Sequence, residues 1–392
     1  MLRRVFFLVA MPFVCCLTTA NSYAAAAADE CKVQDTVDAA IKPLMEKHHI
    51  PGMAVAVTVD GAECFYNFGV MSKDTEQAIT RATLFEAGSI TKTLTATLAA
   101  YAEASGRLSL SDSVSKYVPS LRGSVFDGVS VLNVGTHTAG GLPLQVPDNV
   151  ATNEQLMAYF RHWEPRHVAG TSRTYSNLSA GLLGMVAANS LKLTFADAME
   201  KHLFPALGMR HSFINVPAEQ MTNYAQGYNN NDEPVRVRPG LLWAETYGVK
   251  TTTSDLIHFL ALNMQPSALP PPWQRAIIAT QVPRFRTGAI VQALMWEQYS
   301  YPVKLEQLLS GNSASMIFQD VPAARVAASA PGPDILMNKT GSTSGFGSYI
   351  AFVPSRKIGV VIMANKSYPI PDRVTAAYRI MGGLDRHGKA SD

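Results

Sequence analysis

The chain has 392 residues, of which 47% are hydrophobic and 16% are charged, and its formal net charge at pH 7 is +3. This composition excludes an intrinsically disordered chain, and the length allows one large domain or two closely packed domains. The weak positive charge, without a basic run, argues against a nucleic-acid-binding protein. It leaves room for a positive cleft that takes an anionic small molecule.

The first two dozen residues have the features of a secretory signal peptide. Met1-Leu2-Arg3-Arg4 is basic, residues 5–20 are apolar but short for a membrane span, and small residues follow. The triplet Ser22-Tyr23-Ala24 predicts cleavage after Ala24. Residues 1–24 are therefore expected to be removed and the mature protein to be exported to the periplasm. An uncleaved membrane anchor is the alternative.

Removal of the signal leaves two of the four cysteines, Cys31 and Cys64, because Cys15 and Cys16 lie within it. A pair of cysteines in an oxidising compartment can form a disulfide, and two free thiols are the alternative. No CxxC motif or Cys/His cluster indicates a metal site, so we expect neither a metal nor another cofactor.

The mature chain begins with a predicted helix and a β-hairpin. Apolar residues recur at helical spacing over residues 33–48. Residues 53–59 and 62–70 are rich in strand-forming side chains, and the Asp60-Gly61 pair between them is typical of a type I′ turn.

The middle of the chain is predicted to be mainly helical. Residues 91–104 and 178–189 have helical patterns, and residues 138–143 form a loop of glycine and proline. Residues 229–239 and 265–272 are expected to be loops as well, because they are polar or rich in proline.

The C-terminal part repeats the strand pattern of the beginning. Residues 348–353 and 358–364 predict two strands joined by a turn, and residues 372–381 predict a closing helix. Strand pairs at both ends, with helical sequence between them, predict an antiparallel sheet built from both termini and flanked by helices.

The fold class that follows is α/β of the α+β type, with two lobes. Residues 30–88 and 285–392 are expected to form a discontinuous α/β lobe, and residues 89–284 a mainly helical lobe.

The first of three short strings that indicate chemistry is Ser89-Ile90-Thr91-Lys92. Gly88 precedes it and a helical pattern follows, so Ser89 is expected at a helix N-terminus, where backbone N–H groups favour developing negative charge. Lys92 is three residues further on and lies on the same helical face. A poorly solvated lysine near other cations has a lowered pKa and can take the serine proton. Alone, the string also fits a capping serine with an exposed lysine.

The second string is Tyr175-Ser176-Asn177. On a turn or a short extended stretch, the side chains of Tyr175 and Asn177 point the same way. Tyr175 can then relay a proton, provided that nearby cations lower its pKa, while Asn177 offers an amide to a substrate carbonyl. Alone, the string also fits a core tyrosine followed by a helix cap.

The third string is Lys339-Thr340-Gly341, which follows an apolar run and precedes a stretch rich in glycine and serine. Lys339 is therefore expected near a strand end, where it and Thr340 could hold a substrate carboxylate. Gly341 is expected to let the substrate lie close to the backbone. The backbone N–H groups of Ser89 and Ser342 are expected to form an oxyanion hole.

Together, the three strings predict a serine acyl-transfer enzyme. With Leu142-Pro143-Leu144-Gln145, Tyr247-Gly248-Val249-Lys250 and residues 339–353, they make the chain resemble the class C (AmpC-type) β-lactamases of the penicillin-recognising serine enzyme family. The resemblance covers the chain from about residue 33 to its end. It implies a β-lactamase/transpeptidase-like fold with the active site at the interface of the lobes.

The resemblance also implies a role for each matching residue. Ser89 would be acylated, Lys92 would be its proton partner, Tyr175 would help to activate the deacylating water, and Lys339 would complete the catalytic group. Either Lys92 or Tyr175 could be the acylation base. The residues expected to bind substrate are Gln145, Asn177, Tyr247, Thr340, Gly341, Ser342 and Arg373.

Three positions depart from the family pattern. Asn338 stands where many class C enzymes have histidine, and Ser367 and Ile370 stand where many have asparagines near the carboxylate pocket. An apolar Ile370 donates no hydrogen bond, so carboxylate recognition is expected to depend more on Lys339, Thr340 and Arg373, with a changed substrate profile.

The function expected from the resemblance is hydrolysis of the β-lactam amide through a serine acyl-enzyme, with a preference for cephalosporins, in a monomer without stable membrane association. A DD-peptidase or a carboxylesterase of the same fold is the alternative. The intact Lys339-Thr340-Gly341 argues against an esterase, and Gln145, Tyr247 and the stretch around Asn229 argue against a peptidase. A penicillin-binding sensor is a third hypothesis, but no second hydrophobic segment tethers the chain to a membrane.

Overall fold

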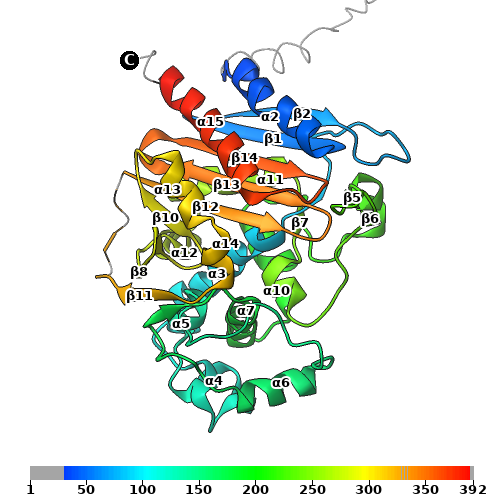
Figure 1. Cartoon of the computed structure of the whole chain (residues 1–392). Coiled ribbons are helices and arrows are strands. Elements are labelled where there is room, and N and C mark those ends of the chain that lie inside the picture. The colour runs from blue at the N-terminus through cyan, green and yellow to red at the C-terminus, as the bar shows by residue number, and fades with distance from the viewer. Residues whose placement is uncertain (1–30, 328, 331, 333, 389–392) are drawn as a thin grey trace, which may run out of the picture.

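The computed structural model describes residues 31–388 apart from residues 328, 331 and 333, so the predicted signal peptide lies outside the described residues. The centre of the molecule is a ten-stranded antiparallel sheet with the strand order β2-β1-β14-β13-β12-β10-β9-β8-β11-β4. Figure 1 shows this sheet in the upper half of the molecule and a group of helices below it.

The strands of the large sheet are β1 (Gly52–Val59), β2 (Ala62–Gly69), β4 (Ser172–Arg173), β8 (Phe285–Thr287), β9 (Ile290–Gln292), β10 (Glu297–Ser300), β11 (Val321–Arg325), β12 (Ile335–Ser342), β13 (Gly347–Val353) and β14 (Ile358–Ala364). Two small sheets pair β3 (Phe85–Glu86) with β7 (Lys250–Thr251) and β5 (Gly227–Tyr228) with β6 (Pro234–Val235).

The α-helices are α2 (Gln34–His48), α3 (Thr91–Ala104), α4 (Val114–Tyr117), α5 (Val131–Gly135), α6 (Asn153–His162), α7 (Asn177–Leu191), α8 (Phe195–Asp197), α9 (Phe204–Ala206), α10 (Trp243–Tyr247), α11 (Thr253–Met264), α12 (Pro271–Thr280), α13 (Leu305–Gly311), α14 (Ala314–Phe318) and α15 (Ile370–Gly388).

The sheet is built from both ends of the chain, which confirms the predicted fold class. The β1–β2 hairpin turns at Asp60 and Gly61, whose φ angles of 48° and 93° are both positive, as a type I′ turn requires. The other edge of β1 pairs with β14, where Met53 lies opposite Ala364. The N-terminal hairpin thus joins the C-terminal strands directly.

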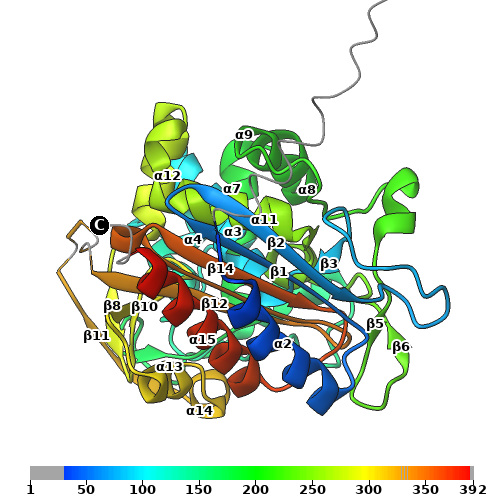
Figure 2. The same cartoon turned by 90° about the horizontal axis from the view of Figure 1, so that it is seen from above.

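Helices cover both faces of the sheet, so its central strands are buried throughout. Along β1, Val55 and Val57 pack toward the layer of α2 and α15, whereas Ala54 and Ala56 pack into the core that contains α11. Figure 2 shows α2 and α15 side by side on one face and α11 on the other. Residues 89–284 were expected to form the helical lobe. Helix α11 lies within this range, yet it packs on the sheet of the α/β lobe.

The proline-rich stretch after α11 corrects a second expectation. Residues 265–272 were expected to be a loop, but α12 begins at Pro271. Proline is tolerated in the first turn of a helix, where its missing N–H has no partner to lose.

A disulfide joins Cys31, just before α2, to Cys64 in β2. It therefore ties the start of the described chain to the edge of the sheet. Within the described residues, no single helix is long and apolar enough to cross a membrane, although the bent pair Asn177–Leu191 and Phe195–Ala206 would pass by length and composition.

The helix that matters most for the site is α3, which is enclosed by α7, α10 and α12. Its first ten residues are all buried, including four threonines. The hydroxyls of Thr93, Thr95 and Thr97 each donate to a backbone carbonyl of the preceding turn, which satisfies them inside the core. The turn that precedes α3 packs against the end of β12.

Candidate active site

Ser89 lies in a single 3₁₀ turn, Gly88–Ile90, that leads directly into α3. The ammonium of Lys92 donates to Ser89 Oγ at 2.8 Å and to Thr246 O at 2.9 Å. Lys92 is completely buried, and this burial, with a smaller contribution from the charge of Lys339, lowers its pKa to about 8. A lysine in this state can exchange a proton with the serine near neutral pH.

Tyr175 lies between the short strand β4 and the start of α7, with its ring close to both lysines. The Nζ atoms of Lys339 and Lys92 are 5.1 Å and 5.3 Å from the ring centroid. Burial raises the pKa of Tyr175, but Lys339, Lys92 and an interaction with the Ser89 hydroxyl outweigh this effect and lower it to about 8. Lys339 and Lys92 therefore lower the pKa of Tyr175, as the sequence analysis requires for a proton relay.

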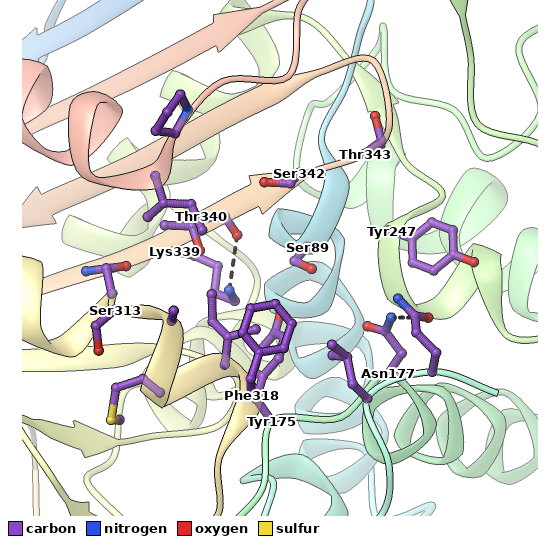
Figure 3. Close-up of a pocket in the computed structure, with 18 of the residues that line it drawn as sticks. Ser89, Tyr175, Asn177, Tyr247, Ser313, Phe318, Lys339, Thr340, Ser342 and Thr343 are labelled. Atoms are coloured by element: carbon purple, nitrogen blue, oxygen red, sulfur yellow. Dashed lines mark hydrogen bonds between the residues drawn. The ribbon is translucent and has the colours of Figure 1, made fainter. Parts of the chain in front are cut away.

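Lys339 and Thr340 lie on β12, next to the turn that carries Ser89. Lys339 Nζ donates to Thr340 O at 3.1 Å, and the side chain of Lys339 is almost completely buried. Figure 3 shows Thr340 and Ser342 along this strand, with Ser342 beside Ser89.

Gly341 is needed for backbone packing inside the protein, which corrects the expectation that it makes room for substrate. A Cβ atom at this position would overlap the carbonyl oxygen of Ala87. The missing side chain allows β12 to pack directly on the segment that contains Ser89.

The same close approach brings together the two backbone groups expected to form an oxyanion hole. Gly88 has a φ of 55°, and a Cβ atom there would overlap the backbone nitrogen of Ser342. The backbone of Ser342 therefore packs against the residue that precedes Ser89, at the N-terminal end of α3, where N–H groups can face a developing negative charge.

Three side chains expected to bind substrate lie together on one side of the nucleophile. Asn177 Nδ2 donates to Gln145 Oε1 at 2.9 Å, while Asn177 Oδ1 has no partner among the described residues. Tyr247, at the end of α10, lies near this pair, as Figure 3 shows. This side can offer amide groups and an aromatic wall to a bound molecule.

These residues surround a pocket of about 900 Å³. Its opposite side is formed by α14 and the residues before it, and Figure 3 shows Ser313 and Phe318 there. The predicted residues that line the pocket are Ser89, Gln145, Tyr175, Asn177, Tyr247, Lys339, Thr340 and Ser342. Residues of the lining that the sequence did not indicate include Arg173, Arg236, Arg238, Glu297, Met316 and Phe318.

Arg373 does not line this pocket, which corrects the expectation of a direct contact with a substrate carboxylate. Its guanidinium is buried behind β12, where it donates to Gly341 O, Ser342 Oγ and Tyr368 O. Arg373 can act on the pocket only through the strand and the Ser342 hydroxyl.

The three departures from the family pattern lie at different depths. Ile370 lines the pocket and gives it an apolar surface at that position. Ser367 does not line the pocket, and its N–H donates to Tyr228 O. Asn338 is completely buried on β12, opposite Glu297 of β10.

A buried ion pair beneath Tyr175 was missed in the sequence. Arg173 donates to Gln292 Oε1 at 2.7 Å, to Glu297 Oε1 at 3.1 Å and to Met316 O at 2.7 Å. It thereby joins β4, at the edge of the sheet, to β9, to β10 and to the segment of α14 that lines the pocket. Only the position of Arg173, two residues before Tyr175, could have drawn attention to it.

Comparisons with known proteins show the family to which the chain belongs. A family model described as Beta-lactamase matches residues 37–384. The chain is 48% identical to a beta-lactamase from Pseudomonas fluorescens over 355 residues, which cover 90% of this chain and 99% of that protein. It is 46% identical to a beta-lactamase from Providencia stuartii over 354 residues, which cover 90% and 92% of the two chains.

Solved structures give the same picture. A class C beta-lactamase in complex with cefoxitin superimposes with a TM-score of 0.87 and 53% identity, covering 91% of this chain and 99% of that chain. A structure named beta-lactamase/D-alanine carboxypeptidase, from Pseudomonas syringae, superimposes with a TM-score of 0.88 and 47% identity, covering 89% and 98%.

Proposed function

The chain belongs to the beta-lactamase family, and we propose that Ser89 is the nucleophile with which it opens the β-lactam ring. The protein is a class C serine β-lactamase that hydrolyses the cyclic amide of its substrate. The main support for Ser89 as the nucleophile is the 2.8 Å hydrogen bond from the buried ammonium of Lys92 to Ser89 Oγ. The same ammonium lies 5.3 Å from the ring centroid of Tyr175.

In the first half of the reaction, Ser89 Oγ attacks the β-lactam carbonyl carbon and its proton passes to the Lys92–Tyr175 pair. Both members have a pKa of about 8, so a proton can pass between them at little cost. The backbone N–H groups of Ser89 and Ser342 stabilise the negative charge on the carbonyl oxygen. The ring nitrogen then leaves with a proton from the pair.

In the second half, a water molecule attacks the ester carbonyl of the acyl-enzyme. Tyr175 takes a proton from this water while Lys92 and Lys339 stabilise the phenolate form. Cleavage of the ester returns a proton to Ser89 Oγ and restores the resting enzyme.

Substrate recognition is divided between the two sides of Ser89. Lys339 and Thr340 bind the carboxylate of the substrate, and Ile370 lies against the same end of the pocket. Gln145 and Asn177 contact the amide of the acyl side chain, with Tyr247 as a wall.

We also propose that the protein is exported to the periplasm and acts there as a monomer without stable membrane association. The N-terminal sequence supports export, and so does the Cys31–Cys64 disulfide, because disulfides persist in oxidising compartments.

A steady-state panel of a cephalosporin, a penicillin, a short ester and a D-alanyl-D-alanine peptide tests the function. We expect many turnovers per active site on the cephalosporin, at a kcat/KM above that for the other three substrates. A single burst of product followed by silence would favour a peptidase or a penicillin-binding sensor. The highest kcat/KM on the ester or the peptide would refute the assignment.

A further inference from the structure

His137 contacts the chain on both sides of Tyr175. The N–H of Thr174 donates to His137 O at 2.9 Å, and the N–H of Ser176 donates to His137 Nδ1 at 3.3 Å. Between these two bonds, the rings of His137 and Tyr175 lie with their centroids 4.7 Å apart. The backbone N–H groups of both residues next to the tyrosine are therefore bonded to one residue.

His137 is itself held firmly by the end of α5. Its φ of 59° lies in the left-handed region, which a non-glycine residue keeps only when its surroundings impose it. The hydroxyl of Thr136 donates to Leu132 O at 2.8 Å and is hydrogen-bonded to the hydroxyl of Thr138 at 2.9 Å. The N–H of Thr138 donates to Asn133 O at 2.8 Å. The loop is thus anchored on each side of the histidine.

The hydrogen bond from Ser176 requires a neutral imidazole with its proton on Nε2, because Nδ1 is the acceptor. Burial holds the pKa of His137 well below its ordinary value, and the charges of Arg173, Lys92 and Lys339 on three other elements lower it further. The imidazole therefore keeps its acceptor through the neutral range.

We propose that His137 is a positioning residue for Tyr175, whose carbonyl and imidazole fix the phenol between Lys92 and Lys339. The inference rests on the function proposed above, in which Tyr175 takes a proton during the reaction. The ring centroid is 5.1 Å from one ammonium and 5.3 Å from the other, so a shift of the flanking backbone changes both electrostatic contacts together. A misplacement of about 1 Å in an active site can cost about 10²-fold in rate.

Two variants distinguish the effect of the hydrogen bond from Ser176 to the imidazole from the effect of the ring contact with Tyr175. His137→Phe keeps an aromatic ring beside Tyr175 but leaves the buried N–H of Ser176 without its acceptor. His137→Asn gives up the ring but places an oxygen near the position of Nδ1, and asparagine tolerates the left-handed backbone. We expect His137→Phe to lower kcat on a cephalosporin about 10- to 100-fold and His137→Asn to stay within about threefold of wild type. Equal losses in the two variants would overturn the proposal.

A double-mutant cycle with Tyr175→Phe distinguishes positioning from a general loss of stability. In the Tyr175→Phe background, adding His137→Phe is expected to change kcat less than about twofold, because the group that it positions is gone. The same fold loss in both backgrounds would refute the proposal. If Tyr175→Phe alone left kcat unchanged, the role of Tyr175 in the proposed function would fail instead.

The cycle remains informative if His137→Phe does not fold. His137→Gly removes both ring and acceptor without backbone strain, since glycine adopts a positive φ freely. It is expected to show the same dependence on Tyr175, with melting temperature and the fraction of sites labelled by a cephalosporin measured for each variant. An additive effect of His137→Gly would overturn the proposal in the same way.

Discussion

The field of Lys339 on Tyr175 leads to a quantitative prediction for Lys339→Met. If the 5.1 Å from Lys339 Nζ to the ring centroid of Tyr175 is taken as the separation of the two charges, they interact by about 3 kcal/mol at an effective dielectric constant of about 20, which corresponds to about 2 pKa units. Methionine keeps the apolar stem and removes the charge. Burial raises the pKa of Tyr175, and in the variant only Lys92 and the Ser89 hydroxyl still lower it. The pKa of Tyr175 should therefore rise from about 8 to roughly 10.

The measurement is a pH titration of the free enzyme, followed by the NMR signal of the tyrosine ring carbon that carries the hydroxyl. Tyr175→Phe assigns the signal among the 14 tyrosines of the chain. Lys304→Met, which removes an exposed lysine just before α13, is the matched control and should leave the pKa of Tyr175 near 8. A pKa that stays near 8 in Lys339→Met would refute the electrostatic reasoning.

Three further predictions concern the fold. Gly341→Ala should abolish most activity and lower the melting temperature, because its methyl group would overlap a backbone carbonyl, whereas Gly382→Ala, with open space around it, should leave both nearly unchanged. Reduction of the Cys31–Cys64 disulfide, whose cysteines are 33 residues apart, should lower the free energy of unfolding by about 2–4 kcal/mol in denaturant titrations, and an unchanged midpoint would contradict this. Burial raises the pKa of Glu245 from 4.5 to about 7, so the folded state retains a proton that the unfolded state loses and stability falls as pH rises through this window. Glu245→Gln should therefore stabilise the protein by up to about 3 kcal/mol at pH 8 and hardly at all at pH 4, and equal effects at both pH values would disprove the assignment.

The parts of the site that the sequence predicted well are those that depend on local geometry. Ser89 and Lys92 are three residues apart on a helix, so their proximity follows from helical spacing alone. The hairpin at Asp60 and Gly61 is equally local, because the turn type depends on two residues.

The parts that were missed depend on neighbours that are distant in the chain. Gly341 is explained by the carbonyl of Ala87, more than 200 residues away, and no pattern around the glycine indicates that contact. Arg373 has a basic side chain at a plausible place in the sequence, yet its buried hydrogen bonds to β12 exclude direct contact with substrate. His137 offered no signal at all, since its role requires the two backbone bonds on either side of Tyr175.

The central claim is that Ser89 forms the acyl-enzyme and that Lys92 is needed to form it. The most direct test mixes a cephalosporin with wild-type protein, Ser89→Ala and Lys92→Ala, and follows the intact mass of each in a rapid-quench series. We expect a transient adduct on Ser89 in the wild type, no adduct in Ser89→Ala, and acylation slowed by about 10²–10⁴-fold in Lys92→Ala. An adduct of the same mass in Ser89→Ala, or near-normal acylation in Lys92→Ala, would contradict this claim.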